Sequence, residues 1–150
     1  MAEQSIFYRD IETGWLLKCR PDYKIDKLVL DLKTAENAST SSIDRNFIKL
    51  GYHLQDAMYS FIADAEEFYF AVIESKPPFV ITAPVELPLE LKQQGFVDFR
   101  LGLRDLVYAF QNNEWKPYFE GLYTIQSKPW QVEPDVNEHY EQLQEEALHE

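Results

Sequence analysis

The fold is decided by residues 21–33, which read Pro-Asp-Tyr-Lys-Ile-Asp-Lys-Leu-Val-Leu-Asp-Leu-Lys. The last six of these residues alternate with a period of two, which is the spacing of a β-strand. Side chains of a strand alternate between its two faces, so Asp31 and Lys33 point the same way. The stretch therefore predicts a strand that carries a carboxylate and an ammonium on one face.

A β-hairpin is expected around this strand. Residues 15–25 are also strand-like, and the polar pair Asp26-Lys27 is typical of the turn between two strands. If the turn is symmetric, continuing the register outward places Asp22 directly opposite Asp31. The Cβ atoms of the two residues would then lie about 4.5–5.5 Å apart.

Two apposed carboxylates indicate a metal site. They repel each other, and a bound divalent cation turns the repulsion into coordination. Hard oxygen ligands favour Mg²⁺ or Mn²⁺. Lys33 is placed to hold an attacking water or to neutralise phosphoryl oxygens, as a metal-dependent phosphodiesterase requires. The alternative is that these charges are simply the solvated face of an amphipathic hairpin.

A second spacing lies in the helix that is expected over residues 43–64. Tyr52, Gln55 and Tyr59 stand at i, i+3 and i+7, which is one stripe of a helix. The glutamine and the second tyrosine could orient a phosphate or position Lys33. Alternatively, Tyr59 is a half-buried aromatic residue and Gln55 a surface residue.

The remaining pattern predicts an α/β fold. The predicted strands are residues 5–9, 15–25, 28–33, 67–74 and 79–85, and the predicted helices are residues 43–64 and 89–111. Three strands, a helix, two strands and a helix indicate a mixed central sheet flanked by two long helices. Gly95 and Gly102 weaken the second helix, because glycine costs about 1 kcal/mol in a helix interior.

Length, composition and charge indicate the number of domains, the location of the protein and its possible partners. The 150 residues suit one domain, with residues 1–130 as the core and residues 131–150 as an acidic tail that is either helical or disordered. No segment is typical of a signal peptide or a membrane span, so a cytoplasmic protein without membrane contact is expected. The 26 acidic against 14 basic residues oppose DNA binding by the surface as a whole.

Three ordered motifs carry a family resemblance. Leu17-Lys18-Cys19-Arg20-Pro21-Asp22, Leu30-Asp31-Leu32-Lys33-Thr34 and the segment Gly51 to Tyr59 resemble the exodeoxyribonuclease VIII (RecE-like) group of PD-(D/E)xK nucleases. The resemblance runs from about Glu3 to Pro129. Tyr8-Arg9-Asp10 is similar to a string that precedes the Pro-Asp motif in phage lambda exonuclease.

The resemblance implies a restriction-endonuclease-like core that digests double-stranded DNA from an end in the 5′ to 3′ direction with Mg²⁺. The implied metal ligands are Asp22, Asp31 and the carbonyl of Leu32, with Asp10 as a weaker candidate. The implied catalytic residues are Lys33, Asp22, Asp31, Gln55 and Tyr59.

It further implies ring-shaped trimers or tetramers and a role in phage or prophage recombination beside a single-strand annealing protein. In such a ring Lys18, Arg20, Arg45 and Tyr52 could face the DNA in spite of the acidic surface. Family members carry a helical region before the first strand that supplies another site residue, which Glu3 could replace here. The competing hypothesis is a truncated, non-catalytic nuclease fold that acts as an acidic interaction module.

Overall fold

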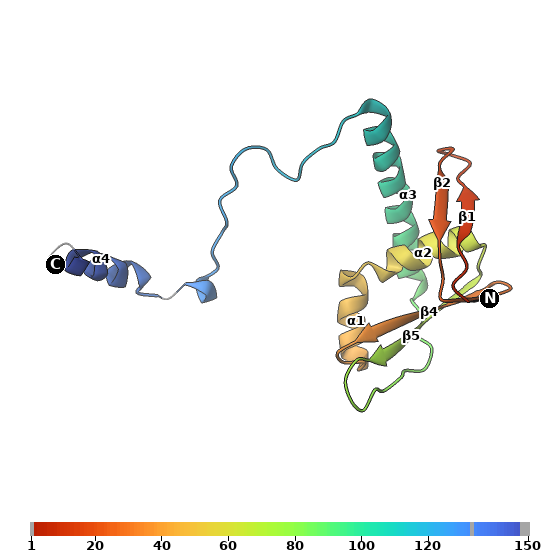
Figure 1. Ribbon diagram of the computed structural model, residues 1–150, viewed down its shortest axis with the longest axis horizontal. Helices are drawn as coiled ribbons and strands as arrows, with labels where there is room; N and C mark the ends of the chain where they lie inside the picture. Colours follow the sequence, from red (N-terminus) through yellow and green to blue (C-terminus); the bar gives the residue numbers. More distant parts are fainter. Residues whose placement is uncertain (1, 133, 148–150) are drawn as a thin grey trace. The chain divides into compact units, whose positions relative to one another are not determined.

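The computed structural model describes residues 2–132 and 134–147, and it divides into two compact units, Met1–Glu114 and Trp115–Glu150 (Figure 1). The expected boundary at residue 130 lies inside the second unit. The strands are β1 Ile6–Arg9, β2 Leu16–Cys19, β3 Tyr23–Ile25, β4 Leu28–Ala35 and β5 Glu67–Glu74. The helices are α1 Thr40–Lys49, α2 Tyr52–Ala63, α3 Leu89–Asn112, the 3₁₀ turn η1 Pro129–Gln131 and α4 Val136–Ala147.

A mixed three-stranded sheet lies at the centre of the first unit, in the order β3-β4-β5. The strands β3 and β4 are antiparallel and joined by Asp26-Lys27, so the predicted hairpin turn is confirmed. The strands β4 and β5 are parallel, and Asp31 is paired in register with Phe70. The α/β class with a mixed sheet, expected from the order of elements, is the observed architecture.

The expected continuous strand over residues 15–25 is wrong. It is two strands in two sheets: β2 pairs with β1, and β3 pairs with β4. Between them lies the buried Pro21, which has no N–H to donate and keeps the preceding residue out of many backbone conformations. The proline therefore ends one ladder just before Asp22, and the next ladder begins after it.

The expected single helix over residues 43–64 is also wrong, because α1 and α2 are separate helices. Gly51 lies between them at a φ of 74°, in the left-handed region that glycine adopts without steric cost and that ends a helix. The break changes the direction of the chain. As a result Gln55 and Tyr59 belong to a helix that is oriented independently of α1.

The expected strand over residues 79–85 does not form as a regular strand. Only isolated bridges link Ile81 to Ile73 and Val85 to Phe70. Pro84 interrupts this segment, and proline cannot donate a ladder hydrogen bond. The segment leads into α3, whose predicted extent is confirmed.

Gly95 is explained by the contact between α3 and α2. A Cβ at this position would lie 2.0 Å from the carbonyl oxygen of His53. No side chain fits there without moving the backbone of one helix. The residue that weakens the helix locally is therefore the one that allows the two helices to approach closely.

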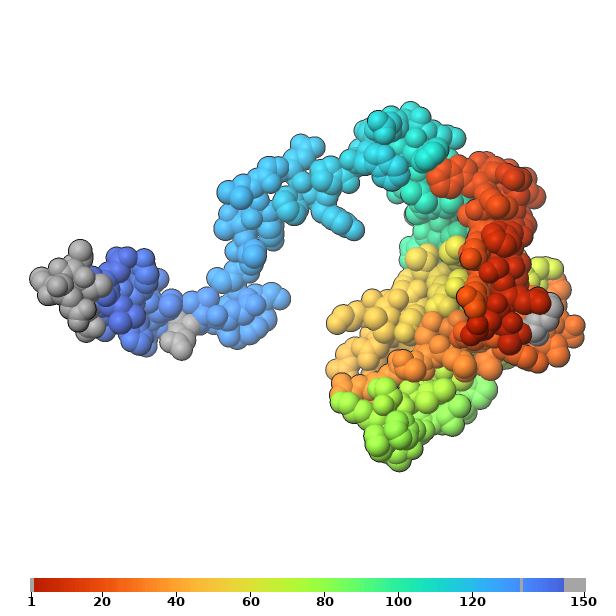
Figure 2. Space-filling model, viewed as in Figure 1, coloured from red at the N-terminus to blue at the C-terminus, as the bar shows by residue number. Residues whose placement is uncertain are grey.

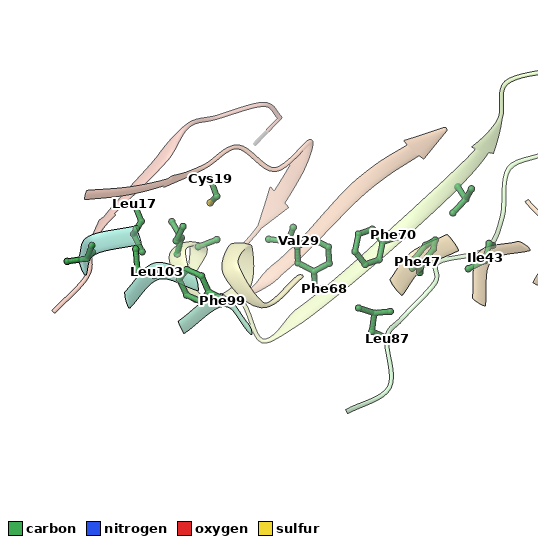
Figure 3. Packing of buried hydrophobic residues seen from close by; sticks show 14 residues of the cluster. Leu17, Cys19, Val29, Ile43, Phe47, Phe68, Phe70, Leu87, Phe99 and Leu103 are labelled. Carbon is green, nitrogen blue, oxygen red and sulfur yellow. The ribbon is translucent and has the colours of Figure 1, made fainter. Parts of the chain in front are cut away.

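One buried cluster joins the two sheets to the helices (Figure 3). Phe68 and Phe70 of β5 pack with Val29 of β4 beneath the three-stranded sheet. Leu17 of β2 lies beside Leu103 of α3 at one end of the cluster, and Phe47 and Ile43 of α1 lie at the other. Because the cluster is continuous, β4 and α2 are held rigidly enough to position side chains between them.

In the second unit the acidic tail is helical over α4, as one of the two alternatives predicted. No helix among the residues that the structure describes is long and apolar enough to cross a membrane.

Candidate active site

The two aspartates of the hairpin lie at neighbouring places in the sheet. Asp31 is in the middle of β4 and is 4% exposed, while Asp22 comes directly before β3 and is half-buried. Oδ2 of Asp22 accepts a hydrogen bond of 2.7 Å from the N–H of Leu32. The N–H and C=O of a strand residue point to the same side, so the carbonyl of Leu32 is directed toward the edge where Asp22 lies.

Gln55 of α2 bridges Asp31 and Lys33. Its amide nitrogen donates to Oδ1 of Asp31 at 2.9 Å, and its carbonyl oxygen accepts from Nζ of Lys33 at 2.6 Å. Nζ also lies 2.5 Å from Oδ2 of Asp31 as an ion pair. One glutamine therefore fixes the carboxylate and the ammonium at the same time.

Aromatic rings enclose the ammonium from the other side. Nζ of Lys33 lies 4.5 Å from the ring centroid of Tyr52 and 5.7 Å from that of Phe70. The two rings stack on each other with centroids 5.6 Å apart. A cation over aromatic faces is stabilised without being neutralised, so Lys33 is held in place and keeps its charge for a further anion.

The surroundings of Asp31 disfavour the ionised form of its carboxyl group. Burial raises its pKa, and the charge of Asp22 adds to the rise, while Lys33 and Gln55 oppose it. Burial also raises the pKa of Tyr59, and the charges of Asp31 and Asp22 raise it further. A hydrogen bond with the backbone of Arg20 acts in the opposite direction. Both carboxylates thus act electrostatically on the phenol of Tyr59.

The second carboxylate oxygen of Asp31 has Lys33 as its partner. Oδ2 of Asp31 is buried and forms no hydrogen bond with any residue that the structure describes, although Lys33 approaches it as an ion pair. Residues 2–132 and 134–147 hold no cluster of three or more His, Cys, Asp or Glu side chains that could bind a metal. Mg²⁺ is commonly held by one or two carboxylates, with waters and substrate phosphates completing the shell. Asp22, Asp31 and a main-chain carbonyl fit that kind of site.

A cavity of about 780 Å³ opens beside Lys33. It is lined by the end of β4, by α1 and by the loop after β5, which Figure 2 shows next to one another in shades from orange to green. Asn37, Ser42 and Asn46 supply polar groups, and Phe47 and Tyr52 supply apolar surface. A cavity with an apolar wall, amides and an ammonium at its rim suits a nucleotide.

Asp10 has a structural role in this fold. Its two oxygens accept hydrogen bonds from the backbone and hydroxyl of Thr13 and from the guanidinium of Arg100. The hydrogen bond from Arg100, aided by those from Thr13, outweighs burial and lowers the pKa of Asp10 to about 2. Its lone pairs are therefore used inside the protein, and the structure does not bring it to Asp31.

The basic residues that were expected to meet DNA are on the surface. The guanidinium of Arg20 forms an ion pair with the carboxylate of Glu3 at 2.5 Å. The backbone N–H of Glu3 donates to the carbonyl of Asp22. Nζ of Lys18 lies 5.9 Å from the ring centroid of Phe7. Arg45 is exposed on α1, and Tyr52 lines the cavity.

Phe70 and the amides of Asn37 and Asn46 were not predicted as site residues. Phe70 lies in an apolar run that was expected to be buried, and only its register beside Asp31 brings it under Lys33. The two asparagines lie in a turn-rich stretch and on α1. No spacing in the sequence distinguishes them from ordinary capping and surface residues.

The α/β fold of this chain, with its mixed sheet, is consistent with a restriction-endonuclease-like core, and a solved structure shares the fold. A structure from Eubacterium rectale described as "Putative exonuclease" superposes with a TM-score of 0.61 at 15% sequence identity. The match covers 85% of this chain and 55% of the other, so the chain spans about half the length of that protein. No family model and no curated protein matches the sequence.

Proposed function

We propose that this chain is a metal-dependent exodeoxyribonuclease that hydrolyses phosphodiester bonds from the ends of double-stranded DNA in the 5′ to 3′ direction. The observation that carries the proposal is the bridge of Gln55 between the buried Asp31 and Lys33. A carboxylate that could bind a metal and a fixed ammonium beside it are what hydrolysis of a phosphodiester needs. The exonuclease-like neighbour supports the same reaction class.

The proposed cofactor is Mg²⁺ or Mn²⁺, held by Asp22, Asp31 and the carbonyl of Leu32. When bound, it would supply Lewis-acid stabilisation of the phosphoryl oxygens. The protein's own contribution is to hold Lys33 beside the scissile phosphate, where the ammonium offsets the negative charge that develops during attack. Gln55 orients Lys33, and the hydroxyl of Tyr59 helps to position the phosphate.

The proposed substrate is bound by local rather than overall charge. Lys18, Arg20 and Arg45 lie on the surface of a protein whose net charge is −12, and binding to phosphates depends on such cations where they meet the DNA. A ring of three or four copies would direct them to a central duplex. Within a phage or prophage, the product strand would pass to a single-strand annealing protein.

Digestion of end-labelled linear duplex and of closed circular duplex, each with Mg²⁺, Mn²⁺ or EDTA, tests the activity. Linear DNA alone should lose its label, and only with metal. Calorimetric titration of Mg²⁺ should show binding that Asp31→Asn abolishes. The matched control is Asp26→Asn, which changes the exposed aspartate of the same hairpin and should leave binding unchanged.

The competing hypothesis, a non-catalytic acidic interaction module, makes a different prediction. It expects no loss of label with any metal, and metal binding that is the same in the wild type and in Asp31→Asn. Two carboxylates rather than three in the described site and the acidic surface favour it. Cleavage that depends on both metal and Asp31 would exclude it.

A further inference from the structure

Asp56 and Ser60 present a second polar face of α2. Oγ of Ser60 donates a hydrogen bond of 3.1 Å to Oδ1 of Asp56. Asp56 is only 2% exposed, and its Oδ2 has no hydrogen-bond partner among the residues that the structure describes. A buried carboxylate oxygen without a donor is costly, because a charge that leaves water needs a compensating partner.

This aspartate lines a cavity of about 260 Å³. Three aromatic rings, those of Phe61, Phe68 and Phe96, line the same cavity, together with Ser60 and Glu66. The face of an aromatic ring carries negative charge and attracts a cation. A lining that combines aromatic rings with carboxylates is one that can bind an organic cation.

The charges around the cavity are predominantly negative. Lys92 is the cation on the lining, and its Nζ donates to Oε1 of Glu86 at 2.8 Å rather than to Asp56. Burial raises the pKa of Asp56 to about 6, and the charge of Lys92 opposes the rise. The lining therefore carries two carboxyl groups, those of Asp56 and Glu66, against one lysine that is paired with Glu86.

We propose that this cavity binds an organic cation, a primary ammonium or guanidinium on a short alkyl chain, whose N–H groups donate to Oδ2 of Asp56. The alkyl chain would lie against the rings of Phe61, Phe68 and Phe96. An anion is excluded by the two carboxylates, and a neutral apolar molecule would leave Oδ2 unpartnered. This site is independent of the proposed nuclease function.

The same chemistry can come from a free amine or from a lysine or arginine side chain of another protein. Calorimetric titration of the full chain at pH 7.5 would use n-butylammonium and 1,4-diaminobutane as free amines. N-acetyl-lysine methylamide represents the side chain. Tighter binding of the blocked lysine identifies a protein side chain as the source, and tighter binding of the diamine identifies a free amine.

The expected result is saturable binding of n-butylammonium and none of n-butanol, which has the same chain without the charge. Asp56→Asn should weaken binding at least tenfold while preserving the fold, since asparagine keeps the bond from Ser60 and removes a buried charge. Asp64→Asn, at the exposed C-terminal end of α2, is the matched control and should bind as the wild type does.

Lys92→Met gives a second test that does not depend on whether the Asp56→Asn variant folds. Removing the resident cation should tighten the binding of n-butylammonium several-fold. Equal binding of n-butylammonium to the wild type and to Asp56→Asn would overturn the proposal. So would the absence of saturable binding in both the wild type and Lys92→Met, which would mean that the unpartnered oxygen of Asp56 does not recruit an organic cation.

Discussion

Asp10 and Asp31 are two buried aspartates in different regions of the fold, and they differ in how their oxygens are used. Asp10, in the loop after β1, is 2% exposed and has both oxygens bound by Thr13 and Arg100. Asp31, in β4, is 4% exposed, yet its Oδ2 accepts no hydrogen bond from the described residues. The two carboxyls shift in opposite directions: the pKa of Asp10 is lowered to about 2, and that of Asp31 is raised.

Burial alone therefore does not identify a functional carboxylic acid. Burial raises the pKa of both groups, and the partners decide the outcome. Arg100 ties Asp10 to α3, which makes this aspartate a structural link. Asp31 is held by a neutral glutamine and by a lysine that itself has a second partner, so its ionised form is compensated less completely than that of Asp10.

The largest effect is expected from Lys33→Ala. Removing one group that stabilises charge in a transition state costs about 10²–10³ in rate, so digestion of linear DNA should fall by about that factor. Lys33→Ala also leaves the buried Asp31 without its cation, so thermal unfolding should shift to a lower temperature and the rate is compared per folded molecule. Lys27→Ala, in the turn of the same hairpin and paired with Asp64 on the surface, is the control, and an equal loss in that variant would show that charge loss in general is responsible.

Asp10→Ala should destabilise the fold without lowering the rate of digestion. It leaves Arg100, whose side chain is 12% exposed, without its buried partner, and breaking a buried ion pair costs about 3–5 kcal/mol. Denaturant unfolding should show this loss, while the rate of digestion per folded molecule is unchanged. Loss of activity in a fully folded Asp10→Ala protein would return Asp10 to the active site.

A smaller effect is expected from Gln55→Ala. Without the bridge Lys33 loses one hydrogen-bond partner but keeps the ion pair with Asp31, so the rate should fall about tenfold, near the 1.4 kcal/mol of a typical positioning contact. Tyr59→Phe should reduce the rate less. Initial rates on end-labelled duplex would rank the two variants, and a loss from Tyr59→Phe equal to that from Lys33→Ala would contradict the ranking.

The two aspartates Asp10 and Asp56 should also differ in how stability depends on pH. The pKa of Asp10 is lowered in the folded state, so its stabilisation is present above pH 3.8 and is lost as the pH falls toward about 2. The pKa of Asp56 is raised to about 6, so stability falls as the pH rises from 3.8 to about 6 and is then constant. Melting of the wild type, Asp10→Asn and Asp56→Asn from pH 2 to pH 8 separates the two windows. Parallel curves for the three proteins would contradict both assignments.

Local signals made the hairpin predictable from the sequence. The alternation over β4 and the polar pair Asp26-Lys27 are determined by neighbouring residues, and they place Asp31 and Lys33 on one face. The periodicity of α3 is equally local. The single strand expected over residues 15–25 and the single helix expected over residues 43–64 were both wrong, although each contains a residue that indicates a break. Pro21 ends the ladder of β2, and Gly51 separates α1 from α2.

The rest of the site depends on contacts between distant segments. Gln55 reaches both Asp31 and Lys33 only because α2 packs beside β4, and Phe70 lies under Lys33 only through the parallel register of β5. Arg100 approaches Asp10 from a helix 90 residues away in the sequence. No spacing in the chain distinguishes these partners from ordinary core or surface residues.

The most direct test of the central claim compares the wild type with Lys33→Ala on the same linear duplex, labelled at one end, in Mg²⁺ and in EDTA. The wild type should remove label progressively in Mg²⁺ and not in EDTA, while a folded Lys33→Ala protein should remove it about 10²–10³ times more slowly in Mg²⁺ and not at all in EDTA. Undiminished digestion by Lys33→Ala, or no digestion by the wild type with any divalent cation, would contradict it.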